Sequence, residues 1–277
     1  MRSHNVSGGG GIKLHVSDQG RKDAPAILFI HGWAQHTICW HGQAPLADNF
    51  RVVALDLRGH GSSEAPQNES AYTDTRLWAD DINAVITELG LKNVVLVGWS
   101  YGARVIASYL GAFGQGAVAG IVLAGGIIAI GKHREPWMVG EGSPGRNPDL
   151  YTTEQSSLIQ ATTRFVDQCT YTPLPRETFG EFVGANMLVS PLVRRALFAG
   201  HLDCRPVWQR FTKPALIIHG ANDAVVEPIV GKAAHEALPN STLQLWDKTG
   251  HAPFAEYPKR FNAELAAFAT QACQEVV

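Results

Sequence analysis

The chain has 277 residues, of which 45% are hydrophobic and 17% are charged, and its formal net charge is -2. The apolar fraction is large enough for a sizeable buried core, and the low share of charged residues argues against disorder. No run of five or more like charges occurs, which excludes the basic surface that nucleic acids and anionic membranes require.

The N-terminal segment, MRSHNVSGGGGIK, has no apolar region of the kind found in secretory signals. No run of 18 apolar residues follows it, so no membrane span is expected. We therefore expect a cytoplasmic protein. Its cysteines are widely spaced with no CxxC pair, and we interpret them as free thiols rather than as a disulfide or a metal site: Cys39, Cys169, Cys204 and Cys273.

Apolar runs of strand length alternate with stretches of helical periodicity along the chain. The first run, residues 11–16, alternates with period two and is typical of an edge strand. The later runs are continuously apolar, like parallel strands covered by helices on both faces: 26–30, 52–55, 94–97, 121–123 and 215–218; residues 242–246 are expected to form one more strand. Helical periodicity fits 76–89, 103–113 and 257–271. This order predicts an α/β fold with a mainly parallel sheet.

The alternation is interrupted between residues 130 and 206. This segment holds glycines, prolines, scattered aromatic residues and short helical pieces, but no convincing strand. We interpret 130–206 as a helical lid inserted into a core domain formed by 1–129 and 207–277. Ligands of open α/β sheets bind at the carboxyl ends of the strands, so the lid should cover that edge. Its basic and acidic residues balance, so a carrier protein is a possible partner but not a favoured one.

The pentapeptide Gly-Trp-Ser-Tyr-Gly at 98–102 directly follows the strand 94–97 and opens the helix 103–113. A serine nucleophile must stand clear of the backbone on a sharp strand-to-helix turn, and glycines two residues to either side avoid a steric clash there. The N-terminus of the following helix favours negative charge nearby. This context predicts Ser100 as a catalytic nucleophile.

The acid and the base of a triad are expected after later strands. Asp223 stands just past the strand 215–218, and His251 follows the strand 242–246. The chain order serine, acid, histidine fits a triad assembled at strand ends. We therefore predict His251 as the general base and Asp223 as the acid that orients it, with Asp247 as the only nearby rival for the acid.

An oxyanion hole requires two backbone N–H groups. One should come from the residue after the nucleophile, Tyr101, and the other from the loop after an earlier strand. The sequence Phe-Ile-His-Gly-Trp at 29–33 supplies such a loop, and Trp33 is the candidate donor. We interpret His31 in this loop as structural, because His251 is the better base.

The pocket beside these residues should be apolar. Trp99 is a candidate because of its place in the elbow, although it could equally be buried there. Trp137 and Met138 are candidates on the lid, although helix packing would explain Trp137 as well. Other large apolar side chains of the lid could wall the pocket, and we expect about half to pack on the core instead: Phe165, Phe179, Phe182, Met187 and Phe198.

A further polar motif, Asp-Leu-Arg-Gly-His-Gly at 56–61, follows the strand 52–55. It could be a substrate or metal site, but we interpret it as a bend fixed by charged hydrogen bonds. No HExxH motif and no clustered His or Cys spacing suggests a metal. We expect neither a metal nor a cofactor.

Together these motifs resemble the α/β-hydrolase superfamily over residues 10–272. Within it, the chain looks most similar to the cofactor-free haloperoxidase/perhydrolase-like esterases and to the pimeloyl-carrier-protein methyl ester esterases. The latter share the Gly-Trp-Ser elbow and the His-Ala-Pro-Phe ending. The chain departs from both groups at Tyr101, where they usually carry Met or Leu. The matching segments are His31-Gly32-Trp33, 56–63, the serine elbow, His219-Gly220-x-x-Asp223 and Gly250-His251.

This resemblance and the predicted triad imply a serine hydrolase that cleaves carboxylic esters of small, largely apolar molecules through an acyl-enzyme on Ser100. Relatives that use an aspartate at the elbow, the haloalkane dehalogenases and epoxide hydrolases, are disfavoured by the serine. Carbon–carbon bond hydrolases and perhydrolases keep a serine and remain alternatives. A ligand-binding receptor of the same fold is a further alternative, although a receptor has no need of all three triad groups.

Overall fold

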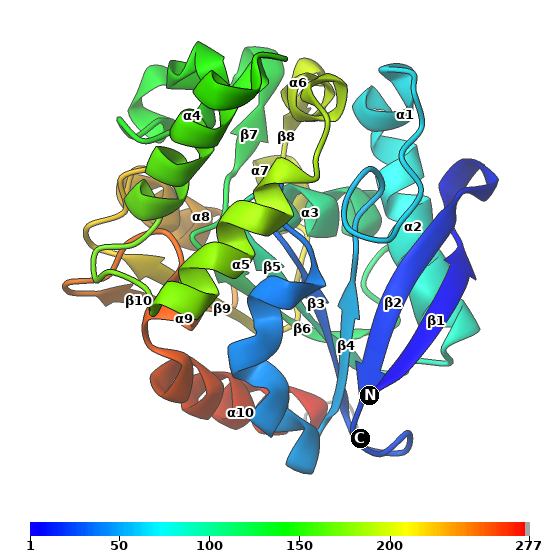
Figure 1. Ribbon diagram of the computed structural model, residues 1–277. Helices are drawn as coiled ribbons and strands as arrows, with labels where there is room; N and C mark the ends of the chain where they lie inside the picture. The colour runs from blue at the N-terminus through cyan, green and yellow to red at the C-terminus, as the bar shows by residue number, and fades with distance from the viewer. Residues whose placement is uncertain (275–277) are drawn as a thin grey trace.

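The computed structural model describes residues 1–274 and contains an eight-stranded sheet flanked by helices (Figure 1). The strands lie in the order β1-β2-β4-β3-β5-β6-β9-β10, and all neighbours are parallel except the pairs β1–β2 and β2–β4. Their bounds are Arg2–Ser7 (β1), Lys13–Gln19 (β2), Ala26–Ile30 (β3), Arg51–Leu55 (β4), Val94–Trp99 (β5), Val118–Ala124 (β6), Ala215–Gly220 (β9) and Ser241–Trp246 (β10). The predicted fold class is confirmed.

The longer helices form two layers, one on each face of the sheet. On one face α3 packs against β3, β5 and α2, and on the other α10 packs against β5, β6 and the 3-10 segment η2. The helices of the core are α1 (Ser70–Thr73), α2 (Thr75–Glu88), α3 (Tyr101–Phe113), α7 (Arg205–Trp208), α8 (Ile229–Ala237), α9 (Pro253–Glu256) and α10 (Pro258–Gln274), with η1 (Gly9–Gly11) and η2 (Thr37–Asp48). Helices on both faces explain why the inner strands are continuously apolar in sequence.

The edge of the sheet differs from the prediction. Residues 11–16 were expected to form an edge strand, but β1 lies outside β2 and is the true edge. Only Val6 of β1 is buried, so the strand carries almost no hydrophobic signal. The glycine run 8–11 makes the turn between the two strands, with Gly10 and Gly11 at positive φ of 74° and 76°. The Gly9 N–H donates to Asp81 Oδ1 at 2.8 Å, which fixes this turn to α2.

Asp18 on β2 joins the edge hairpin to the centre of the sheet through two arginines. Arg2 donates to Asp18 Oδ1 at 2.7 Å, and Arg51 on β4 donates to Oδ2 at 3.0 Å. Burial alone would raise the pKa of Asp18, but the hydrogen bonds and charges of Arg2 and Arg51 outweigh it and lower the pKa from 3.8 to about 2. The ionised carboxylate is therefore the form that the folded protein binds.

We expect Asp18→Asn to lower the Tm at pH 7 by roughly 5–10 °C, because it leaves the buried Arg51 without its counter-charge. A folded-state pKa below the ordinary value gives stability that is present above pH 4 and disappears as the pH falls to 2. The difference in Tm between wild type and Asp18→Asn should therefore shrink over this pH interval, measured by calorimetry. Asp23→Asn, which removes an exposed acid, is the control. A difference that stays constant down to pH 2 would contradict this account.

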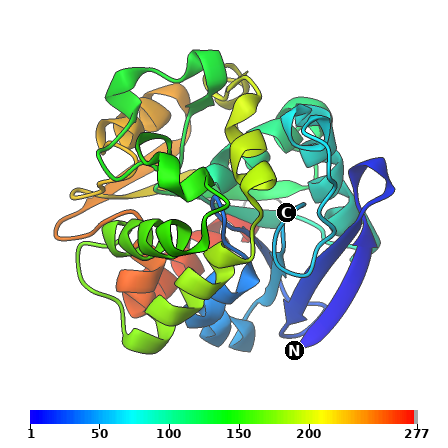
Figure 2. The ribbon, with the colours of Figure 1, turned by 45° about the horizontal axis from the view of Figure 1, so that its top comes forward.

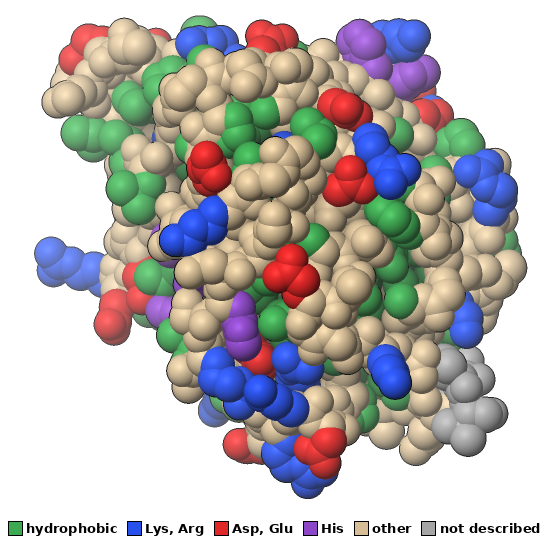
Figure 3. All heavy atoms as spheres, turned by 90° about the vertical axis from the view of Figure 1, so that its right-hand side faces the viewer, with side chains coloured by type: hydrophobic (Ala, Val, Ile, Leu, Met, Phe, Trp, Pro, Cys, Tyr) green, Lys and Arg blue, Asp and Glu red, His purple; other side chains and the backbone are tan. Residues whose placement is uncertain are grey.

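Acidic and basic side chains are interspersed on the face that carries the β1–β2 edge and α2, and neither sign dominates it (Figure 3). Among the described residues, no single helix is long and apolar enough to cross a membrane. Within residues 1–274, one pair of helices, α5 (Arg176–Met187) and α6 (Pro191–Ala199), passes by length and composition together, and the chain bends by 82° between them.

A helical insertion follows β6 and crosses the carboxyl ends of the strands (Figure 2). It begins with β7 (Ala129–Ile130), which pairs with β8 (Leu202–Asp203) as an antiparallel two-residue ladder. The sequence did not indicate these strands because two residues are too few to show a period. The helices between them are α4 (Gln155–Gln168), α5 (Arg176–Met187) and α6 (Pro191–Ala199), and the 3-10 turns are η3 (Gly131–His133), η4 (Pro136–Met138), η5 (Pro144–Arg146) and η6 (Pro148–Tyr151).

Candidate active site

Ser100 lies on the sharp turn between the end of β5 and the start of α3. Its backbone has φ 52° and ψ -112°, a conformation that L-residues rarely adopt. A Cβ at Gly98 would come within 2.8 Å of the backbone carbon of Gly102, and a Cβ at Gly102 would collide with the carbonyl oxygen of Ile30. Both glycines are therefore required for the close packing of strand, turn and helix.

His251 and Asp223 meet beside this turn. Asp223 lies in the loop after β9, His251 follows β10, and the His251 Nδ1 lies 2.8 Å from Asp223 Oδ2. β9 and β10 are parallel neighbours, so the loops after their carboxyl ends lie together. Both side chains are buried. The bond to Nδ1 leaves the other ring nitrogen, Nε2, as the one that can accept a proton.

Asp223 is held by four donors. Its Oδ1 accepts the N–H groups of Val225 and Val226 at 2.8 and 2.9 Å. Its Oδ2 lies 3.1 Å from His219 Nε2, in addition to His251. Burial would raise the pKa of Asp223, but the charge of His251 and the hydrogen bonds from both histidines lower it below its usual range. The carboxylate therefore remains ionised and can accept the Nδ1–H of His251.

The backbone around His251 is fixed by several further contacts. Its N–H donates to the carbonyl of Cys169 at 2.9 Å, and its carbonyl accepts Trp99 Nε1–H at 2.9 Å. The Glu256 carboxylate accepts the N–H groups of Gly250 and of Tyr171 at 2.7 and 2.9 Å. Sequence reasoning missed this role of Glu256, because only its three-dimensional place shows that it bridges the histidine loop to the chain after α4.

Ser100 and His251 line one narrow cavity under the insertion. Apolar side chains form most of the wall, and among the described residues that line it Arg134 is the only Lys, Arg, Asp or Glu. The remaining lining residues are Trp33, Trp99, Ile127, Ser143, Pro144, Phe165, Phe198, Val225 and Val226. The expectation of an apolar pocket at this place therefore agrees with the lining, and Trp99 is part of it.

The predicted donors of an oxyanion hole are the backbone N–H groups of Trp33 and Tyr101. Tyr101 is the first residue of α3, so its N–H has no acceptor in the preceding turn. Trp33 follows His31-Gly32, and a Cβ on Gly32 would lie 3.2 Å from the Ser100 Cβ, so this loop packs against Ser100. Among residues 1–274, neither N–H donates a backbone hydrogen bond outside regular elements. Both are therefore available to an oxyanion next to Ser100.

Two predicted pocket residues lie elsewhere. Trp137 is 37% exposed and borders a different surface hollow, beside Ile229 of α8. Met138 is buried, but its carbonyl accepts the Glu227 N–H at 3.4 Å, and it does not border the cavity of Ser100. The adjacent Val139 forms a β-bridge with Val226, which ties η4 to the loop that follows Asp223. The prediction that Trp137 and Met138 line the pocket was wrong.

Some of the large apolar side chains of the insertion line the cavity, and others pack on the core. Phe165 of α4 and Phe198 of α6 line the cavity, and both contact the Trp33 ring, at 5.3 and 6.4 Å between centroids. Phe182 of α5 instead packs on Trp99, at 6.1 Å. Phe179 also packs against the hydrophobic core.

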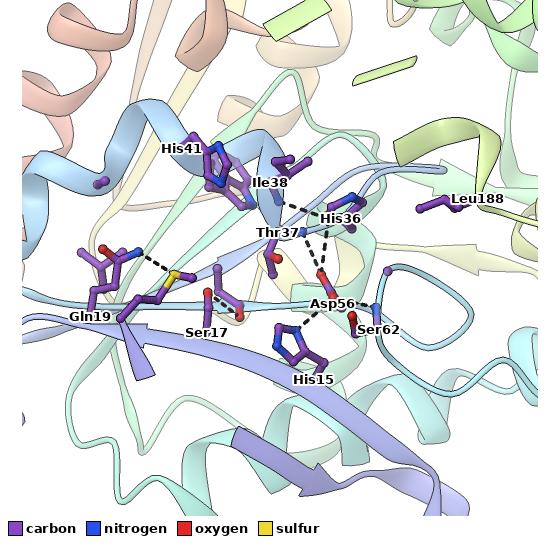
Figure 4. A pocket seen from close by; sticks show the side chains of 16 residues that line it. His15, Ser17, Gln19, His36, Thr37, Ile38, His41, Asp56, Ser62 and Leu188 are labelled. Carbon is purple, nitrogen blue, oxygen red and sulfur yellow. Dashed lines mark hydrogen bonds and ion pairs between the residues drawn. The ribbon is translucent and has the colours of Figure 1, made fainter. Parts of the chain in front are cut away.

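Asp56 occupies the bend after β4 and borders a second, more open pocket (Figure 4). It accepts the N–H groups of Thr37 and Ser62 at 2.8 and 2.9 Å, and His15 Nδ1 lies 3.0 Å away. Arg58 makes a bidentate ion pair with Asp81 of α2. These contacts fix the bend, as interpreted from the sequence. No group of three or more His, Cys, Asp or Glu side chains within residues 1–274 is arranged to hold a metal ion.

The other residues weighed from the sequence are His31, Asp247 and the four cysteines. His31 is fully buried, and its Nε2 accepts the Leu57 N–H at 3.0 Å while burial lowers its pKa to about 3. His31 is therefore a neutral side chain that links two loops by a hydrogen bond. Asp247 is exposed, and the carboxylate that contacts His251 is that of Asp223. All four cysteines are free thiols.

Comparison with known proteins identifies the family. The sequence profile of the alpha/beta hydrolase family matches residues 27–264. The chain is 30% identical to a bifunctional esterase/perhydrolase of Acinetobacter calcoaceticus, over 93% of this chain and 96% of that protein. It is 25% identical to a pimeloyl-[acyl-carrier protein] methyl ester esterase of Nitrosospira multiformis, over 94% and 99%. Both resemblances expected from the motifs are thus confirmed.

A solved structure of an esterase has the same fold as this chain. The crystal structure of an esterase from Rhodococcus sp. ECU1013 superposes with a TM-score of 0.92 at 35% identity, covering 98% of this chain and 99% of that one. The chain belongs to the α/β hydrolase family. It is a hydrolase-like protein whose relatives include esterases.

Proposed function

We propose that this protein is a serine esterase that hydrolyses small carboxylic esters. The observation that carries the proposal is the bond of 2.8 Å between His251 Nδ1 and Asp223 Oδ2, made beside a strained serine turn in the same cavity. This combination supplies a nucleophile, a base and an orienting acid at one place.

In the proposed reaction the Ser100 hydroxyl attacks the ester carbonyl while His251 Nε2 takes its proton. The N–H groups of Trp33 and Tyr101 stabilise the oxyanion, and the alcohol leaves with the proton that His251 returns. Water then attacks the carbonyl of the acyl-enzyme while His251 takes its proton. The carboxylic acid is released as Ser100 regains a proton from His251. Asp223 keeps the imidazole in the tautomer that exposes Nε2.

Perhydrolysis is the second candidate, and the specific observation in its favour is the esterase/perhydrolase relative. In this reaction hydrogen peroxide attacks the acyl-enzyme carbonyl in place of water. The acyl group leaves as a peracid, and Ser100 regains its proton. Both products come from the same acyl-enzyme, so the same triad serves either acceptor.

The proposal is tested with p-nitrophenyl esters of straight-chain acids from acetate to decanoate. Because Phe165 and Phe198 narrow the cavity, we expect the highest kcat/KM for short acyl groups and a decline for long ones. Adding hydrogen peroxide measures how the acyl-enzyme partitions between acid and peracid. If no ester in the series is hydrolysed and a fluorophosphonate probe fails to label the protein, the esterase assignment is wrong.

A further inference from the structure

Arg134 is a positively charged side chain in a mostly apolar cavity. It follows η3, and its side chain lines the same cavity as Ser100 and His251. Burial lowers the pKa of its guanidinium, yet arginine keeps its proton in proteins. The cavity therefore holds a fixed positive charge beside the proposed nucleophile.

No described acidic residue neutralises this charge. The two acids close to it in sequence pair elsewhere: Glu135 lies 3.9 Å from Arg205, and Glu141 lies 3.6 Å from Arg146. The partial compensation that Arg134 does have comes from the Phe198 ring, whose centroid lies 5.3 Å from the guanidinium carbon. Arg134 is only half-buried, but its charge faces the cavity without a counter-ion among the described residues, so the site favours a ligand that brings the negative charge.

Most N–H donors of the Arg134 side chain have no acceptor among the described residues. The guanidinium has five N–H donors, and the structure shows one side-chain bond, from Nη2 to Ser143 Oγ at 2.6 Å. Ser143 is itself 1% exposed and lines the cavity, and its hydroxyl can still donate while it accepts from Arg134. A guanidinium fork beside a buried hydroxyl matches the two oxygens of a carboxylate.

We propose that Arg134 and Ser143 form a subsite for a carboxylate on the substrate, so that the native substrates are esters that carry a second, free carboxylate. This inference rests on the esterase function proposed above and specifies its substrate class. The carboxylate could belong to the acyl part, as in a monoester of a dicarboxylic acid, or to the alcohol part, as in an acylated hydroxy acid. In both cases Arg134 fixes the charged end while the ester carbonyl lies against Ser100.

The first test uses the wild-type protein and pairs of esters matched in length. Monomethyl adipate is compared with methyl heptanoate for the acyl side, and O-acetylglycolate with propyl acetate for the alcohol side. We expect kcat/KM to be about tenfold or more higher for the anionic member of at least one pair, the range expected for a charged hydrogen bond in a dry site. The pair that shows the preference identifies the side that carries the carboxylate.

The second test uses three variants in the same assays. Arg134→Met removes the charge and keeps an apolar chain on Phe198, and we expect the ratio of kcat/KM for anionic over neutral ester to fall about tenfold. Arg134→Lys should retain part of the ratio, because it keeps the charge but loses the fork. Arg146→Met is the matched control, since it removes a positive charge from the same segment but from a side chain outside the cavity, and the ratio should stay at the wild-type value.

Two results would overturn the carboxylate subsite. One is a wild-type protein that hydrolyses neutral esters but shows no preference for either anionic partner. The other is an Arg134→Met variant that folds and loses activity on anionic and neutral esters by the same factor, which would make Arg134 a purely structural lid residue. In both cases the hydrolysis of neutral esters would leave the esterase proposal intact, whereas loss of all ester turnover in the wild type would refute that proposal instead.

Discussion

Ser100→Ala should lower kcat for ester hydrolysis by about 10^6-fold while the protein remains folded, as expected when the members of a triad act as a unit. The alanine retains the Cβ that already tolerates φ 52°, so the turn acquires no new strain. The substitution removes only the hydroxyl that we propose attacks the carbonyl. The measurement is kcat on a short p-nitrophenyl ester, with the Tm recorded for each protein.

Ser108→Ala is the matched control for this variant. Ser108 is a buried serine of the same helix, α3, and its hydroxyl donates to the Arg104 carbonyl at 3.1 Å instead of facing the cavity. We expect this control to keep wild-type kcat. A folded Ser100→Ala variant with more than about one hundredth of wild-type activity would exclude Ser100 as the nucleophile, because triad knockouts lose far more.

Asp223→Asn should lower kcat by about 10^4-fold, the size of effect that follows when the orienting acid of a triad loses its charge. The asparagine oxygen can take the place of Oδ1 and still accept the N–H groups of Val225 and Val226, so the loop should keep its shape. Its NH2 group would then face His251 Nδ1, which would have to accept a hydrogen bond instead of donating one. In that tautomer the ring proton sits on Nε2, so Nε2 can no longer act as the base.

The control for this prediction is Asp247→Asn, which neutralises the exposed acid that follows β10. We expect it to leave kcat within about twofold of wild type, as is usual for surface substitutions away from a site. The labelling rate of Ser100 by a fluorophosphonate probe should fall in Asp223→Asn in step with kcat. Activity of Asp223→Asn within tenfold of wild type would show that Asp223 does not orient the base.

The sequence predicted the core of this fold well because its signals are local. A buried parallel strand such as Val94–Trp99 is a continuous apolar run, and the turn that follows it needs glycines at fixed positions around Ser100. Strand ends then locate Asp223 and His251, since parallel strands deliver their following loops to one edge of the sheet. By contrast, β1 was missed because a solvent-exposed edge strand needs few apolar residues.

The insertion could not be predicted at the same level because its side-chain directions depend on non-local contacts. Trp137 was expected in the pocket, but it is exposed and borders a different hollow beside Ile229. Arg134 gave no signal, since one arginine among the balanced charges of the segment has no distinguishing neighbour in sequence. His219 was noted only as part of a motif, and its contact with Asp223 became visible when β9 and its loop were placed. The cytoplasmic location and the limits 130–206 of the lid stay predictions.

Covalent labelling can show whether Ser100 is the nucleophile. The wild-type protein is treated with a fluorophosphonate, digested with trypsin and analysed by mass spectrometry. Cleavage after Lys92 and Arg104 releases the peptide 93–104, in which Ser100 is the only serine. We predict one phosphonyl group per chain, located on Ser100, and loss of esterase activity in proportion to labelling. Labelling of a different residue, or complete inactivation while Ser100 stays unmodified, would contradict the account.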